Sequence, residues 1–227
     1  ISPDVVCIDT DSELEVNTYR EPGLVVPMKS KYQFSTQTII PDKDAACSKS
    51  MYDKMIKVNS FPPNMTLNNI TDLDKVCINL EHQFGGHLTI NLEAPDGSSV
   101  ILLSDENGTG IGNGGNALGL FSKLGIPNES DNINCQPANN PSGTGMLYCW
   151  SPSPTDSTWH YLHKKGRLGN PVTPSDIELG TKIYSAYDES FSNLKDTPLN
   201  GEWTLKVEDI SKGGNGYIFD WWIQFKE

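Results

Sequence analysis

The chain has 227 residues, of which 36% are hydrophobic and 9% aromatic, together with 20 glycines and 15 prolines. That mixture is typical of short strands joined by many turns, and it excludes a long helical or a disordered protein. The formal net charge of −12 repels the phosphate backbone of nucleic acid, so we expect no nucleic-acid partner. Because no apolar run reaches the length of a membrane span, we also expect no direct membrane insertion.

The first stretch of the chain shows no clear period, and prolines break it into short extended pieces. We expect residues 1–53 to be an N-terminal extension that packs on a domain made of residues 54–227. Residues 1–10 lack the basic and apolar regions of a signal peptide, so we expect the chain to be a section of a longer protein. Strands separated by turn sequences are then predicted at residues 55–61, 74–84, 88–94 and 99–104.

Alternation of apolar and polar side chains supports these strands and predicts two more near the C-terminus. In residues 203–208, Trp203, Leu205 and Val207 alternate with polar side chains. Residues 217–225 are predicted to present one aromatic face, which contains Tyr217, Phe219, Trp221, Ile223 and Phe225. A period of two with one apolar face means sheets that each bury one side, which predicts an all-β sandwich.

Between about residues 105 and 200 lies a long loop region rich in Gly, Asn and Pro. Two interpretations fit it equally well: a ligand-binding edge of the sandwich, or a crossover held by a disulfide. The chain has 5 cysteines and no CxxC pair, which in an exported protein predicts two disulfides and one free thiol. Spacing does not determine the connectivity, and the pairing we favour is Cys7 with Cys47 and Cys135 with Cys149.

Two segments resemble the P-domain, the Homo B module that follows the catalytic domain of subtilisin-like proprotein convertases. The first is VCINLEHQFGGHL at residues 76–88, followed by the APDG turn at residues 94–97. The second is LNGEWTLKVED at residues 199–209, followed by GYIFDWWIQF at residues 216–225. The resemblance begins near residue 55 and runs to the C-terminus, and it implies a jelly-roll β-sandwich of about eight strands.

A finer likeness points to one subgroup of this family. CINLEH at residues 77–82, YCWSP at residues 148–152 and NGYIF at residues 215–219 are similar to P-domain-type modules in very large surface proteins of gliding bacteria. The likeness implies a non-catalytic module of a protein that is secreted or displayed on the bacterial outer surface. Such a module would act in adhesion or as a structural or ligand-binding unit. Its partners would be neighbouring domains of the parent protein, surface glycans or another protein.

Two other functions stay open at this point. The chain could be the P-domain of a secreted subtilisin-like serine protease, where it would stabilise the catalytic domain. It could also be a carbohydrate-binding module, which rests on fold analogy alone. No motif of a serine hydrolase is present, and the four histidines stand beside no recognisable nucleophile, so we expect no enzyme. His82, on the apolar face of its strand, is interpreted as a hydrogen-bonded core residue.

Two positions depart from the family pattern. His87 stands where the family has the Asp of a Gly-Asp-Leu turn, and Gly214 stands where it has the Asp of a closing Asp-x-Gly. Both changes remove an anionic ligand, so the calcium site that the family implies is not expected at these turns. Calcium is the one cofactor that we consider elsewhere, since turns rich in oxygen ligands suit it. Its candidate ligands are Asp96, Asp105, Asp188 and Asp209.

Exposed aromatic side chains are the candidates for contact with a carbohydrate ligand. Trp222 lies on the otherwise polar face of the last predicted strand, and Trp150 and Trp159 lie in the long loop region. Stacking on a sugar requires an accessible ring, so these three are the predicted ligand-binding residues. The alternative for Trp222 is packing beneath the N-terminal extension.

Overall fold

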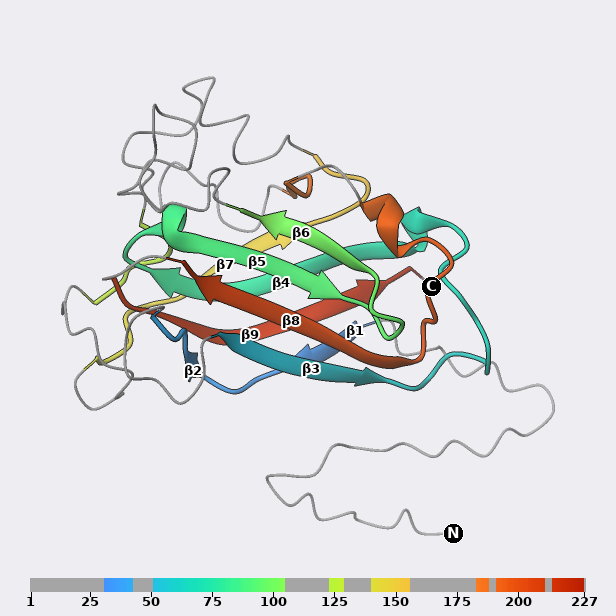
Figure 1. Ribbon diagram of the computed structural model, residues 1–227, viewed down its shortest axis with the longest axis horizontal. Coiled ribbons are helices and arrows are strands. Elements are labelled where there is room, and N and C mark those ends of the chain that lie inside the picture. Colours follow the sequence, from blue (N-terminus) through green and yellow to red (C-terminus); the bar gives the residue numbers. More distant parts are fainter. Residues whose placement is uncertain are drawn as a thin grey trace, which may run out of the picture.

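The computed structural model describes residues 31–42, 51–104, 123–128, 140–155, 183–187, 191–210 and 214–226. These residues form two antiparallel sheets that pack face to face, so the predicted all-β sandwich is confirmed (Figure 1). Sheet A contains β1 (Lys31–Phe34), β2 (Thr38–Ile39), β4 (Leu73–His82), β7 (Met146–Trp150) and β9 (Gly216–Phe225). Sheet B contains β3 (Tyr52–Val58), β5 (Leu88–Glu93), β6 (Ser99–Leu103) and β8 (Gly201–Asp209). Three short 3-10 helices are η1 (Ile70–Asp72), η2 (Gly85–His87) and η3 (Phe191–Leu194).

The strand order interleaves early and late parts of the chain. Sheet A has the order β1-β9-β4-β7, with β2 also paired to β9, and sheet B has the order β3-β8-β5-β6. The C-terminal strands β8 and β9 therefore lie inside the two sheets rather than at their edges. The chain passes back and forth between the two sheets, and the resulting strand order is that of a jelly-roll-type sandwich. Within the described part of the chain, no helix is long and apolar enough to cross a membrane.

The core lies between the sheets and is built from alternate residues of each strand. Trp203, Leu205 and Val207 of β8 are fully buried, as their period of two predicts. The Nε1 of Trp203 donates a hydrogen bond of 3.0 Å to the carbonyl oxygen of Leu199, which satisfies the one polar atom of this ring. Truncation of such a buried tryptophan to alanine typically costs about 3–5 kcal/mol.

The N-terminal segment contributes strands to sheet A. β1 pairs with β9 in a register that places Tyr32 opposite Ile223, and β2 pairs with the start of β9. The ring of Tyr32 is 2% exposed and contacts the rings of Phe61 and Phe225 at centroid distances of 6.4 and 6.3 Å. The described residues before 53 therefore share the hydrophobic core with the domain that follows.

A β-bulge in β9 changes the face that its aromatic residues occupy. Asn79 pairs with Asp220 and the next residue of β4, Leu80, pairs with Ile218, so β9 has one extra residue at this point. Ile218 is consequently buried in the core with Trp221, whereas Phe219 is only partly buried. The prediction of one continuous aromatic face was wrong for Tyr217 and Phe219, because an inserted residue shifts the alternation by one position.

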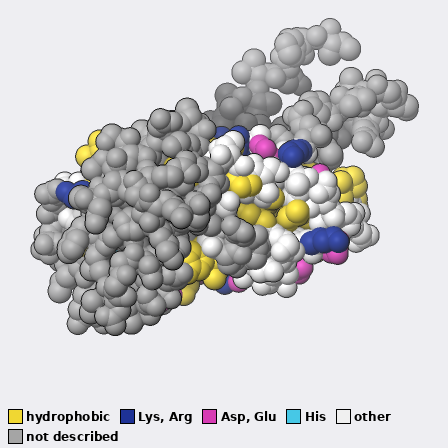
Figure 2. All heavy atoms as spheres, turned by 90° about the horizontal axis from the view of Figure 1, so that it is seen from above, with side chains coloured by type: hydrophobic (Ala, Val, Ile, Leu, Met, Phe, Trp, Pro, Cys, Tyr) yellow, Lys and Arg dark blue, Asp and Glu magenta, His cyan; other side chains and the backbone are white. Residues whose placement is uncertain are grey.

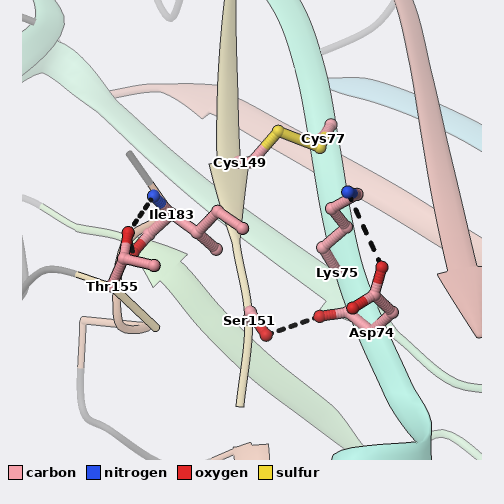
Figure 3. Close-up of a disulfide and its surroundings, with 7 residues drawn as sticks. All are labelled: Asp74, Lys75, Cys77, Cys149, Ser151, Thr155 and Ile183. Carbon is pink, nitrogen blue, oxygen red and sulfur yellow. Dashed lines mark hydrogen bonds and ion pairs between the residues drawn. A yellow bond between two sulfur atoms is a disulfide. The ribbon is translucent and has the colours of Figure 1, made fainter. Parts of the chain in front are cut away.

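The edge strand of sheet A, β7, lies in the middle of the predicted loop region and carries a disulfide. Cys149 of β7 is bonded to Cys77 of β4, 72 residues earlier in the chain (Figure 3). The predicted pair of Cys135 and Cys149 was therefore wrong. β4 and β7 are antiparallel neighbours whose register puts the two cysteines directly opposite, with their Cα atoms 4.1 Å apart. The predicted pair of Cys7 and Cys47, like Cys135, lies outside the described residues.

Candidate functional site

The structure separates the residues that the sequence suggested for binding. The ring of Trp150 is 0% exposed, because β7 turns it into the core, and a buried ring cannot stack on a ligand. This part of the predicted aromatic set was wrong, since alternation was not visible in so short a strand. Trp222 of β9 is partly exposed on the outer face of sheet A. Trp159 lies outside the described residues, as do Asp105 and Asp188.

The two described acidic candidates lie at opposite ends of sheet B. Asp209 ends β8 opposite Leu88 at the start of β5, whereas Asp96 lies in the turn after β5. Asp96 is exposed, and its carboxylate accepts a hydrogen bond of 2.9 Å from the backbone N–H of Ser98. Burial alone would raise the pKa of Asp96, but hydrogen bonds from Ser98 and Thr197 outweigh it and lower the pKa. Because Asp96 and Asp209 lie at opposite ends of sheet B, they cannot belong to one metal site.

A buried cluster of His82, Asp209 and His87 links the two sheets at one end. The Nε2 of His82 donates to Oδ2 of Asp209 at 3.1 Å, and both side chains are 1% exposed or less. The Nδ1 of His87 lies 3.8 Å from Oδ1 of the same carboxylate. The Nδ1 of His82 lies within 3.1 Å of both the backbone N–H and the carbonyl of Phe84. Both ring nitrogens of His82 thus contact the fold itself, which confirms the interpretation of His82 as a hydrogen-bonded core residue.

The two departures from the family pattern meet around the ring of Phe84. This ring lies 4.9 Å from the ring of His87, centroid to centroid. Gly214 has a φ of +86°, and a Cβ at this position would collide with the ring of Phe84. Glycine is therefore favoured at position 214 for two reasons: the positive φ suits it, and there is no room for a Cβ. An Asp would be strained on both counts. The side chains at positions 87 and 214 belong to one local packing arrangement.

The two histidines at Asp209 argue against a calcium ion there. Calcium takes six to eight oxygen ligands, whereas two of the groups at this carboxylate are imidazole nitrogens of His82 and His87; the buried acid Asp42 is the β-bridge partner of Asp209. Among the described residues, no group of three or more His, Cys, Asp or Glu side chains is arranged to hold a metal ion. Calcium at Asp105 or Asp188 stays a prediction.

The outer face of sheet A carries one partly exposed tryptophan in a polar surround. We call it the Trp222 face. It is formed by side chains of β1, β4 and β9 that point away from the core: Lys31, Gln33, Lys75, Asn79, Asp220, Trp222 and Gln224. The Nζ of Lys31 lies 4.0 Å from the centre of the Trp222 ring, in a cation–π contact. The disulfide of Cys77 lies in the same row as Trp222, because the two residues are Cα partners.

Hydrogen bonds on the Trp222 face converge on one carboxylate. Oδ2 of Asp220 accepts a bond of 3.0 Å from Nδ2 of Asn79, and Oδ1 accepts a longer one of 3.5 Å from Nε2 of Gln33. The side-chain oxygen of Asn79 is buried and has no hydrogen-bond partner among the described residues. Asp220 thus offers a carboxylate on the side of Trp222 away from Lys31, and Gln33, the Cα partner of Trp222, offers an amide beside the ring.

Glu81 lies at the far end of the same outer face and is 2% exposed. Oε1 accepts a hydrogen bond of 3.3 Å from the backbone N–H of Gly143, while Oε2 has no partner among the described residues. Burial raises the pKa of Glu81 to about 7, although the bond from Gly143 and the charge of His82 act in the opposite direction. No sequence pattern indicated this buried acid, since a Glu on the polar face of a strand is ordinarily solvated.

The outer face of sheet B has a different chemistry. Its strands pair Asp53 with Lys206 and Lys57 with Glu202, and Nζ of Lys206 lies 2.6 Å from Oε2 of Glu93. Among the described residues of this face, the one large hydrophobic side chain that is strongly exposed is Met55, at 52%. In the view from above, lysine and acidic side chains are interspersed on the described surface rather than gathered in one field (Figure 2).

Comparison with known proteins adds little to this geometry. No family model matches the chain, and no curated protein matches it. A solved structure of a serine protease from Aeromonas sobria in complex with its chaperone has a TM-score of 0.35 and 13% identity to this chain. That match covers 88% of this chain and 27% of the other, so this chain spans about a quarter of that protein. A likeness at this level carries no functional information, and the resemblance to the P-domain family stays a prediction.

Proposed function

We propose that this chain is a non-catalytic β-sandwich module of a large secreted bacterial cell-surface protein, and that it acts in adhesion through the Trp222 face. The observation that carries the proposal is the contrast between the two outer faces. The Trp222 face combines a partly exposed aromatic ring with amide and carboxylate groups, whereas the other face presents paired charges. Surfaces that bind ligands are typically enriched in tryptophan and in oriented polar groups.

The disulfide supports the extracellular part of the proposal. Cys77 and Cys149 join two strands of sheet A, and disulfides persist in oxidising compartments such as the bacterial cell surface. The buried histidine cluster supports the non-catalytic part, because both ring nitrogens of His82 contact groups inside the fold. A module of this kind needs a rigid face more than a reactive side chain.

Adhesion under flow tests the proposal. Beads coated with the purified chain are passed over surfaces coated with polysaccharide or with extracellular-matrix protein, and the retained fraction is counted. We expect retention on at least one surface, a large loss in Trp222→Ala, and no loss in Met55→Ala, which changes the opposite face. Retention on no surface, or equal retention of the two variants, would contradict adhesion through the Trp222 face.

A separate experiment tests the alternative that the chain is the P-domain of a serine protease. The coding region on both sides of this segment is sequenced, and the neighbouring domain is expressed with and without the chain. A subtilisin-type catalytic domain directly upstream, whose melting temperature rises when the chain is attached, would replace the adhesion proposal. Long repeats without a catalytic triad would favour adhesion.

A further inference from the structure

We infer that the Trp222 face binds a glycan that carries a carboxylate, with the sugar ring on Trp222 and the acid group at Lys31 and Lys75. This inference rests on the proposed function and specifies its ligand. It starts from the order in which three kinds of group lie along the outer face of sheet A: two lysines, one indole ring and one carboxylate that accepts hydrogen bonds.

The register of the strands establishes that order. Gln224 of β9 lies between Lys31 of β1 and Lys75 of β4, as the Cα partner of both. Two residues earlier on β9 comes Trp222, and two residues before that comes Asp220. Successive side chains on one face of a strand are about 7 Å apart, so a pyranose ring on Trp222 reaches both neighbouring rows. The lysine row and the Asp220 row therefore lie on opposite sides of a bound sugar.

The indole of Trp222 is partly exposed, and the group that rests on it is the mobile end of a lysine side chain. Lys31 is exposed, and its ammonium rests 4.0 Å from the ring centre, where a ligand would also lie. An exposed cation–π contact is worth only about 0.5–1 kcal/mol, so the flexible lysine can leave the ring at low cost. A ligand carboxylate would draw the ammonium to the edge of the ring and free the indole surface for stacking.

The two lysines beside Gln224 favour an acidic ligand over a neutral one at that end of the face. The chain has a net charge of −12, yet this face offers Lys31 without an ion pair among the described residues. Lys75 lies 3.6 Å from Asp74, and this partly exposed pair is worth little, so a second carboxylate can share the lysine. On the opposite side, Asp220 holds Gln33 by a long bond of 3.5 Å, which sugar hydroxyl donors can replace.

Matched glycan pairs test the inference. The full chain is titrated with sialyllactose and with trigalacturonate, each against its own methyl ester, so that each pair differs mainly in the acid group. We expect at least one acidic member to bind about tenfold more tightly than its neutral counterpart, with affinity that falls as salt is raised. Binding should be lost in Trp222→Ala, and the acidic preference should fall severalfold in Lys31→Gln. Met55→Ala should bind as the wild type does.

Several outcomes would overturn the inference. These are no binding of either acidic glycan, equal binding of both members of each pair, or unchanged affinity in Trp222→Ala. If Trp222→Ala does not fold, Lys31→Gln and Gln33→Ala, both at exposed positions, carry the same test. Retention of beads on protein-coated surfaces without any glycan binding would overturn the inference and leave the proposed function intact.

Discussion

The two outer faces of the sandwich are both made from antiparallel strands but carry different groups. The face of sheet B pairs opposite charges across strands, such as Lys206 with Glu93 at 2.6 Å, and both side chains are partly exposed. The face of sheet A carries Trp222, the disulfide of Cys77 and, at its far end, the buried acid Glu81. Charge pairs in water contribute little, whereas a disulfide, a buried acid and a packed ring each have large energetic consequences. Among substitutions on the two outer faces, those with the largest effects should therefore fall on sheet A.

The largest difference between the faces is expected from the disulfide. Replacement of both Cys77 and Cys149 by alanine opens a link between residues 72 positions apart, which the chain-entropy model values at about 4 kcal/mol. We expect the urea midpoint of the double variant to fall accordingly. In the presence of a reducing agent the wild type should fall to the same midpoint, which serves as the control. A double variant that matches the oxidised wild type would show that the link contributes nothing.

Glu81 of sheet A predicts a pH dependence of stability. Its pKa is raised to about 7 in the fold from an ordinary value of 4.5, so the folded protein holds a proton that the unfolded chain releases. The contribution of Glu81 to stability is therefore complete below about pH 4.5, declines as the pH rises to about 7, and is lost above it. The full decline is on the order of 3 kcal/mol. In Glu81→Gln this part of the decline should vanish, as measured by urea unfolding at pH 5 and pH 8.

The matched control for Glu81 is Glu202→Gln, at an exposed position of β8. It makes the same chemical change on the other face and should leave the pH profile close to that of the wild type. If Glu202→Gln flattened the profile as much as Glu81→Gln, the decline would belong to net charge rather than to the buried acid.

Close packing on the face of sheet A predicts a smaller effect. A Cβ at Gly145 would collide with the ring of Phe219 and the side-chain oxygen of Asn79. Gly145→Ala should therefore cost about 1–3 kcal/mol in the free energy of unfolding. The same change in a Phe219→Ala background should cost clearly less, because the ring is then absent. Equal costs in both backgrounds would rule out the ring as the cause.

The smallest effect is expected on the face of sheet B. Lys206→Ala removes the contact with Glu93, and an exposed pair of this kind is worth about 0–1 kcal/mol. The cost should shrink further in 1 M salt, where screening is nearly complete. A cost above about 2 kcal/mol, or one that salt leaves unchanged, would mean that the face of sheet B is less solvated than its exposure indicates.

Local patterns in the sequence predicted most of the strands. In β8, apolar residues alternate with polar ones in the sequence, and the apolar ones are buried: Trp203, Leu205 and Val207. A sheet with one buried face buries every second residue of each strand, so the alternation predicts the buried residues. The same alternation placed Trp222 on the polar face of β9, where it is partly exposed. Its role in binding stays a prediction. β7 was not predicted, since its five residues lie within a stretch rich in turn formers.

What the sequence by itself determined about this protein is its class: short strands with one apolar face each, which can bury that face only by packing sheet on sheet. The tertiary structure decided the partner of Cys149, the burial of Trp150 and the bulge that turned Phe219 outward. Each of these depends on which strands become neighbours and in what register. The burial of Glu81 is of the same kind, because the segment around Gly143 that contacts it lies 62 residues away in the chain. Local sequence encodes which face of a strand is apolar, but register and neighbourhood are properties of the assembled sheets.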